Sequence, residues 1–203
     1  MNKTLKIIIA LGIIGIGIYF FSQLGAADRA YAEQLEKDRK EKDYAFKHGS
    51  ESPIPEKDRA AFSGLSYFAP APQLKFTLAY QKLNPPEPYL MQTTGNTPQE
   101  YTKYATVTFD LEGKQHTLYL YQRPSGSSDR SFFLPFTDLT NGHQTYGGGR
   151  YLDVEVVGSG QVTLDFNQAY SPYCAFDHEF SCPIPPKENH LPVAILAGEK
   201  VEK

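Results

Sequence analysis

The chain has 203 residues, a length that suits one domain with an appendage. Its 20 Lys and Arg residues are balanced by 23 Asp and Glu residues, so we expect no basic surface of the kind that binds nucleic acid. Aromatic residues make up 13% of the chain and all 15 prolines lie at or beyond Pro53, which favours strands over long helices after that point.

The first segment has the properties of a membrane or export sequence. Residues 7–27 contain no charged side chain, and as a helix they would cover about 30 Å, the thickness of a bilayer core. Lys3 and Lys6 precede them, which predicts a single-pass protein of the inner (cytoplasmic) membrane whose domain lies on the extracytoplasmic, periplasmic side. Alternatively, residues 1–27 are a signal peptide cleaved near Ala27, and the remaining chain is secreted.

Residues 28–50 have the composition of a charged helical stalk. They lack glycine and proline before Gly49, and acids precede bases by one turn in Glu33–Lys37, Glu36–Lys40 and Asp38–Lys42. The apolar stripe is too thin for a buried helix. We interpret the segment as a solvated spacer, with a partner-binding helix as the alternative.

Residues 51–203 are predicted to form a β-rich domain. Apolar and polar residues alternate over 74–80, and again over 103–110 and 115–122, which form a hairpin across Gly113. Residues 131–136 are a short apolar run, whereas Pro85 and its neighbouring prolines argue against a central strand directly after residue 80. With no helical period between them, these strands predict an antiparallel β-sandwich or a partly open barrel.

The candidate site is predicted within residues 145–200. Three glycines precede Arg150, and a second hairpin, 151–157 with 161–166, places Asp165 and Asn167 at a strand end. Prolines then form a rigid connection to a strand predicted at 193–197.

This part of the chain resembles a known sequence family. The segments TYGGGRYLD, DFNQAYSPYCAF and SCPIPPKENHLPVAILAGEK, with the earlier FSGLSYF and FTDLTNG, are similar to the bacterial domain-of-unknown-function family 1684. The resemblance spans nearly everything after the stalk begins, and it implies no activity. Ser171 and His190 depart from the family pattern, which usually has an asparagine and a longer basic residue there; the second departure argues against His190 as a metal ligand. The resemblance marks one block of residues: Tyr146, Arg150, Asp165, Asn167, Tyr170, Cys174, Cys182, Glu188, Asn189 and Glu199.

The two cysteines, Cys174 and Cys182, lie close in sequence. In an exported protein such a pair predicts a disulfide. Free structural thiols are one alternative, and metal or redox chemistry that includes His178 is another. We expect no cofactor and no metal.

The polar residues of the block allow three hypotheses about function. The first is a membrane-tethered domain that binds a small polar or glycan-like ligand, or an envelope partner, through residues 145–200. The second is a hydrolase that uses Asp165 and Glu188 with Arg150. The third is a structural module in which ion pairs and amide bonds only fix loops. The candidate ligand-binding residues are Tyr146, Arg150, Asp165, Asn167, Tyr170, Glu188, Asn189 and Glu199.

Overall fold

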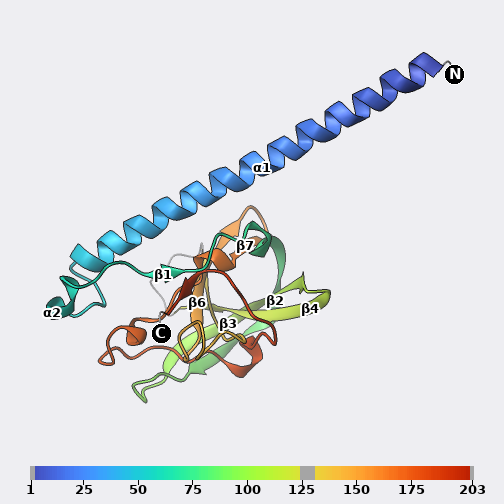
Figure 1. The fold of residues 1–203 in the computed structure, drawn as a ribbon. Coiled ribbons are helices and arrows are strands. Elements are labelled where there is room, and N and C mark those ends of the chain that lie inside the picture. Colours follow the sequence, from blue (N-terminus) through green and yellow to red (C-terminus); the bar gives the residue numbers. More distant parts are fainter. Residues whose placement is uncertain (1–2, 124–130, 202–203) are drawn as a thin grey trace. The chain divides into compact units, whose positions relative to one another are not determined.

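The computed structural model describes residues 3–123 and 131–201, with side chains from residue 25 onward (Figure 1). The chain divides into two compact units, Met1–Arg39 and Lys40–Lys203. The elements are α1 (Lys3–His48), α2 (Glu56–Arg59), β1 (Ser66–Tyr67), η1 (Pro72–Leu74), β2 (Lys75–Met91), β3 (Gln99–Leu111), β4 (Lys114–Gln122), β5 (Ser131–Phe136), β6 (Arg150–Val157), β7 (Gln161–Asp165), η2 (Phe166–Gln168), η3 (Tyr173–Ala175), η4 (Lys187–Asn189) and β8 (Glu199–Lys200).

Helix α1 runs without a break through the predicted membrane segment and the predicted stalk, and it ends at His48, directly before Gly49. In its charged part Gln34 donates a hydrogen bond to Asp38 at 2.7 Å, one turn away. The predicted membrane segment, residues 7–27, falls mostly on residues whose side chains lie outside the description, and it stays a prediction. Among the described residues, none of the helices combines the length and the apolar character that crossing a membrane requires.

Six antiparallel strands, β2 to β7, follow one another around a closed barrel. The ring closes because β7 pairs with the first half of β2, from Lys75 opposite Asp165 to Ala79 opposite Gln161. The sequence predicted a sandwich or a partly open barrel, so its antiparallel β class is confirmed and the open form is wrong. A separate two-stranded sheet pairs β1 with β8.

Both predicted hairpins are present. In the β3–β4 hairpin Leu111 lies opposite Lys114, and Glu112 and Gly113 between them both have positive φ, 53° and 71°. Such a two-residue turn has the twist that an antiparallel pair needs. The β6–β7 hairpin turns across residues 158–160, where both glycines have positive φ.

Strand β2 differs from the prediction. It continues through Pro85, Pro86 and Pro88 to Met91 and pairs with β3 on both sides of them. The register shifts between Lys82 and Glu87, so most of the proline run lies in an irregular part of the ladder that needs fewer amide donors.

The barrel interior is filled by every second residue of its strands, such as Val107, Leu120, Leu134 and Leu164. Residues 191–197, here named the cap segment, belong to this core through Leu191, Val193, Ile195 and Ala197. The predicted strand at 193–197 is therefore buried on one side, but the structure places it in no sheet.

A second cluster is formed by residues that alternate with the core positions and so face outward. Tyr121, Phe133 and Tyr151 are its centre, and Tyr101 stacks on Phe133 with ring centroids 5.5 Å apart. The barrel thus has an apolar interior and an aromatic outer layer over β3 to β6.

The last turns of α1 belong to the same compact unit as the barrel. The ring of Phe46 meets Tyr173 and Phe176 edge to face at 6.2 and 5.4 Å, and Asp43 accepts a hydrogen bond from the amide of Leu65 at 2.9 Å. This unit begins at Lys40, inside the predicted stalk rather than after it.

Candidate functional site

Arg150, the first residue of β6, is completely buried (0% exposed). Its guanidinium donates to the side chain of Asp138 at 2.8 Å and to three carbonyl oxygens: that of Ile195 at 2.9 Å, that of Glu199 at 3.2 Å, and that of Ala197. Burial lowers the pKa of Arg150, and the charge of Asp138 opposes that shift. The partner of Arg150 is therefore Asp138, and not Asp165 or Glu188 as the hydrolase hypothesis required.

Asp138 completes this arrangement. Its Oδ1 atom accepts the amide of Thr140 at 2.8 Å and that of Ile195 at 3.3 Å, while its Oδ2 atom binds Arg150. Both side chains of the pair are fully buried. All their described partners are groups of the chain itself, so the pair fixes the cap segment to the end of the barrel.

Asp165 and Asn167 form a second, separate arrangement. Asp165 accepts the amide of Asn167 at 3.0 Å and lies 3.6 Å from the ammonium of Lys75. The carboxamide of Asn167 bonds both backbone groups of Ala71, accepting at 2.7 Å and donating at 2.8 Å. These bonds attach the chain before β2 to the end of β7.

Glu188 and Asn189 form a third arrangement on η4. Glu188 accepts from Lys103 at 2.6 Å, and the Lys103 ammonium lies 4.3 Å from the centre of the Tyr119 ring. Burial raises the pKa of Glu188, but the hydrogen bond from Lys103, the local backbone hydrogen bond and the charge of Lys103 together outweigh it, and the net pKa is lowered. Burial lowers the pKa of Lys103, but the hydrogen bond to Glu188 and the charge of Glu188 raise it, and the net pKa is raised. Asn189 bonds the backbone of Tyr119 and Pro135.

Glu199 and Tyr170 lie where α1 meets the domain. The buried carboxylate of Glu199 accepts from Lys42 at 2.6 Å and from the amide of Ser171 at 2.7 Å. The Lys42 ammonium also lies 4.9 Å from the centre of the Tyr170 ring, whose hydroxyl donates to Asp153 at 3.0 Å. Burial, and next the charge of Asp153, raise the pKa of Tyr170. Lys42 was expected to pair with Asp38 along the helix; its partner is Glu199.

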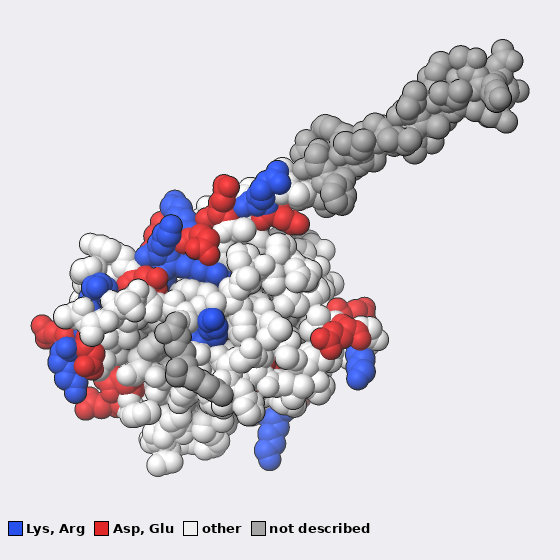
Figure 2. All heavy atoms as spheres, in the orientation of Figure 1, with Lys and Arg blue, Asp and Glu red and all other residues white. Residues whose placement is uncertain are grey.

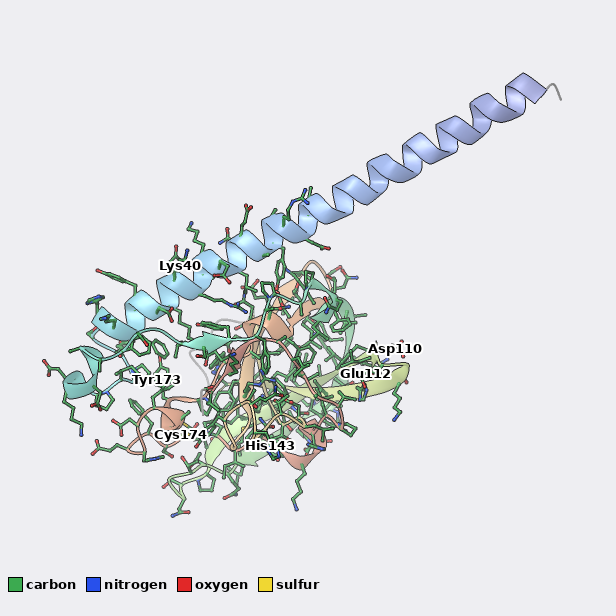
Figure 3. The ribbon with its side chains drawn as sticks, in the orientation of Figure 1. Lys40, Asp110, Glu112, His143, Tyr173 and Cys174 are labelled. Atoms are coloured by element: carbon green, nitrogen blue, oxygen red, sulfur yellow. The ribbon has the colours of Figure 1, made fainter. Side chains whose placement is uncertain are left out.

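Cys174 and Cys182 are neighbours and free thiols, so the predicted disulfide is not present in this structure. The amide of Cys174 donates to the sulfur of Cys182 at 3.1 Å, and the hydroxyl of Tyr146 lies 3.7 Å from the sulfur of Cys174. Burial raises the pKa of Cys182 to about 12 and that of Tyr146 to about 12 as well. The raised pKa values keep the Cys182 thiol and the Tyr146 hydroxyl protonated at physiological pH. Figure 3 shows Cys174 beside Tyr173, on η3.

The predicted residues therefore do not converge on one site. Arg150 pairs with Asp138, Asp165 with Lys75, and Glu188 with Lys103, which makes three separate ion pairs. In the part of the chain that the structure describes, no three side chains of His, Cys, Asp or Glu are placed to hold a metal ion. The paired carboxylates that the hydrolase hypothesis needs are not formed.

Comparison with known proteins gives the family. A family model described as "Protein of unknown function (DUF1684)" matches residues 60–200. The chain belongs to the DUF1684 family. The match confirms the resemblance drawn from the sequence segments, and no curated protein matches the chain.

One solved structure is similar to this DUF1684 chain. The solution NMR structure of an uncharacterized protein of Haloarcula marismortui is 38% identical to this chain, with a TM-score of 0.67. The match covers 85% of this chain and 95% of that one. The similarity extends over most of both chains, and that protein, like the family, is described without an activity.

The structure explains why a glycine precedes Arg150 in the DUF1684 segment TYGGGRYLD. Gly149 has φ 92°, and a side chain there would meet the carbonyl oxygen of Phe136 at 2.6 Å. The glycine before Arg150 is thus required by close packing. Sequence reasoning identified the buried members of the block but missed Lys42, Lys103 and Asp138 as their partners, since nothing local to those three residues marks them.

Proposed function

We propose that this DUF1684 protein is a membrane-tethered, extracytoplasmic domain that acts by binding a partner protein, and that residues 145–200 have no hydrolase activity. One observation carries the proposal. The buried polar side chains Arg150, Asn167 and Asn189 make their hydrogen bonds to the chain's own backbone and to neighbouring carboxylates, whereas several large apolar side chains are exposed.

The exposed apolar residues favour a protein partner over a small polar ligand. Tyr173 and Phe180 pack edge to face at 5.3 Å and are each about two-fifths exposed (40% and 38%). Leu139 and Leu196 are 57% and 49% exposed. Aromatic side chains are enriched at the buried centres of protein interfaces, and exposed aliphatic side chains add apolar area around them, while a glycan or small polar ligand needs free donors and acceptors.

Site-specific photocrosslinking in cells tests the binding proposal. A benzophenone amino acid is placed in turn at Leu139, Tyr173, Phe180, Ala194 and Leu196, and at Glu112 on the β3–β4 turn as the control. We expect a discrete protein adduct from at least one of the first five positions and none from the control. Glu188→Gln should leave the adduct unchanged, because Glu188 is used within the fold. Absence of adducts at all five positions would refute the proposal.

The tether is supported by the uncharged residues 7–27 behind two lysines. We expect the full chain to stay in the membrane fraction after an alkaline carbonate wash, and its domain to be digested by protease added to spheroplasts. A variant that lacks residues 1–27 and carries a cleavable signal peptide should be released in soluble form. A mature chain that begins near Ala27 would show cleavage and a secreted protein instead.

A further inference from the structure

The backbone of the cap segment is held from one side only. Among the residues that the structure describes, every hydrogen bond between its backbone and another segment is made by an odd-numbered residue. Leu191 donates to the carbonyl of Thr137 at 2.8 Å, and Val193 accepts from the amide of Leu139 at 3.1 Å. Ile195 donates to Asp138 at 3.3 Å, and the carbonyls of Ile195 and Ala197 accept from Arg150.

Two even-numbered residues of the cap segment, Ala194 and Leu196, have backbone groups that no described residue pairs with. Neither Ala194 nor Leu196 makes a backbone hydrogen bond among the described residues, and both are exposed, as is Pro192. In extended chain the amide and carbonyl of successive residues point to opposite edges. The cap segment therefore has one occupied edge, formed by its odd residues, and one open edge at Ala194 and Leu196.

Strand β1 pairs with the same edge a few residues further along the chain. The carbonyl of Gly198, the next even residue, accepts from the amide of Phe68 at 3.0 Å, where the β1–β8 sheet begins. Gly198 has φ 77°, which bends the chain between β8 and the cap segment. Strand β1 thus pairs as far as Gly198, and the edge before the bend is left open.

The surface beside the open edge suits an apolar partner. The outward side chains of the cap segment are Pro192, Ala194 and Leu196, and Leu139 is exposed next to them. In Figure 2 charged side chains gather at the β3–β4 hairpin, along the described part of α1 and on the side where α2 lies, while the middle of the face between these groups is mostly uncharged. Unpaired backbone groups flanked by apolar side chains are what an added strand recognises.

We infer that Ala194 and Leu196 form a docking edge for an extended, apolar segment of a partner protein, which joins the cap segment as an additional β-strand. The inference rests on the proposed binding function and names its site and the class of its partner. Two residues spaced by two offer about four backbone hydrogen bonds to such a segment. The sequence predicts a strand at 193–197, and the partner supplies the neighbour that this strand lacks within the chain.

The test uses linear peptides displayed on phage and selected against the full-length protein in detergent. An enriched peptide is synthesised, and its Kd is measured by fluorescence polarisation. Ala194→Pro removes an amide from the open edge and leaves the bonds of the odd residues in place. We expect it to weaken binding about tenfold or more. The matched variant Ala194→Ser keeps the amide and should change the Kd by less than about twofold.

A second arm does not depend on the variant's folding. Two versions of the peptide carry N-methyl groups on alternate residues, so that each blocks the amides along one edge. One version should lose binding and the other should keep it. Hydrogen exchange at the amides of Ala194 and Leu196 should slow when the unmodified peptide binds, while the amide of Ile195, already bonded to Asp138, changes little.

Several outcomes would overturn the inference. The first is that the selection enriches no peptide. The second is that the peptide binds Ala194→Pro and Ala194→Ser with the same Kd. The third is that both methylated peptides lose the same amount of binding. A dimer of the full-length protein that Ala194→Pro dissolves would show that the edge pairs with a second copy instead. Crosslinks from Tyr173 or Phe180 with none from Ala194 or Leu196 would remove this docking edge and leave the binding function standing.

Discussion

The carboxamide of Asn189 pairs with both backbone groups of Tyr119. Its oxygen accepts the Tyr119 amide at 2.8 Å and its nitrogen donates to the Tyr119 carbonyl at 3.0 Å, the bonds that a neighbouring strand would make. The same nitrogen donates to the carbonyl of Pro135 on β5 at 2.9 Å. Strands β4 and β5 are paired at only one described position, Tyr121 with Phe133. Asn189 thus bridges the part of the barrel wall where these two strands separate.

We predict that Asn189→Ala lowers the free energy of unfolding by about 2–4 kcal/mol, because it leaves three backbone groups unpaired, one of them buried and two partly buried. Gln168→Ala, at an exposed position, should change it by less than about 0.5 kcal/mol. Denaturant unfolding is followed by near-ultraviolet circular dichroism, since the chain has 14 tyrosines and no tryptophan. If the two variants unfold at the same denaturant concentration, Asn189 does not hold the barrel wall together.

We predict that Arg150→Met costs about 3–5 kcal/mol, because it leaves the buried carboxylate of Asp138 without its counter-charge. Asp138→Asn in the same chain should recover part of that loss, since the uncompensated charge is then removed as well. A double-mutant cycle on the free energy of unfolding measures the coupling. Additive effects of the two substitutions would contradict a direct pair.

The local elements of the fold could be predicted from the sequence. The β3–β4 hairpin depends on alternating side chains and on one turn at Glu112 and Gly113, all within about 20 residues. Closure of the barrel depends on β2 meeting β7, which lie about 85 residues apart, and no pattern inside either strand selects that partner. An open barrel and a closed one are therefore hard to distinguish from strand patterns alone.

The sequence predicted several of the residues that form buried polar contacts, but it did not predict which residues they pair with. Asn167 and Asn189 were recognised as side chains able to fix backbone, and they do so at Ala71 and Tyr119. The sequence analysis offered Asp165 and Glu188 as carboxylates beside Arg150. The partner in the structure is Asp138, which was not among the candidate residues. The residue type determines how many hydrogen bonds a side chain can make, while the tertiary structure determines which residues are its partners.

We predict that the end of α1 stabilises the domain. Lys42→Met should lower the free energy of unfolding by about 2–3 kcal/mol, because the carboxylate of Glu199 stays buried with only the amide of Ser171 as partner. Lys40→Met, at an exposed position of the same helix, is the control and should be nearly neutral. A fragment of residues 40–203 should fold, whereas one of residues 51–203 should be far less stable. Equal stability of the two fragments would contradict this.

We predict that neither thiol reacts readily in the folded protein. Cys174 and Cys182 are buried, and the raised pKa of Cys182, about 12, keeps that thiol protonated. A maleimide reagent should label the native chain at least ~100-fold more slowly than the unfolded chain, which should give two thiols. If the unfolded chain gives no thiol until a reductant is added, the disulfide predicted from the sequence forms after all.

The ion pair of Glu188 and Lys103 predicts a pH dependence with a definite sign. The pKa of Glu188 is lowered from 4.5 in the folded state, so its contribution to stability is present above pH 4.5 and is lost as the pH falls through the folded pKa. The pKa of Lys103 is raised from 10.5, so its contribution is complete below that value and is lost as the pH rises through the folded pKa. The pair therefore stabilises the fold throughout the range between these limits.

We expect Glu188→Gln to be less stable than the wild type by about 0.2–1 kcal/mol at neutral pH, since the carboxylate is partly exposed. The difference should shrink toward zero below the folded pKa of Glu188, where the wild-type carboxyl is protonated and uncharged. Unfolding midpoints of both proteins from about pH 3 to about pH 7 measure this, with Glu100→Gln at an exposed position as the control. A difference that stays constant across that range would mean that Glu188 acts through its shape and hydrogen bonds and not through its charge.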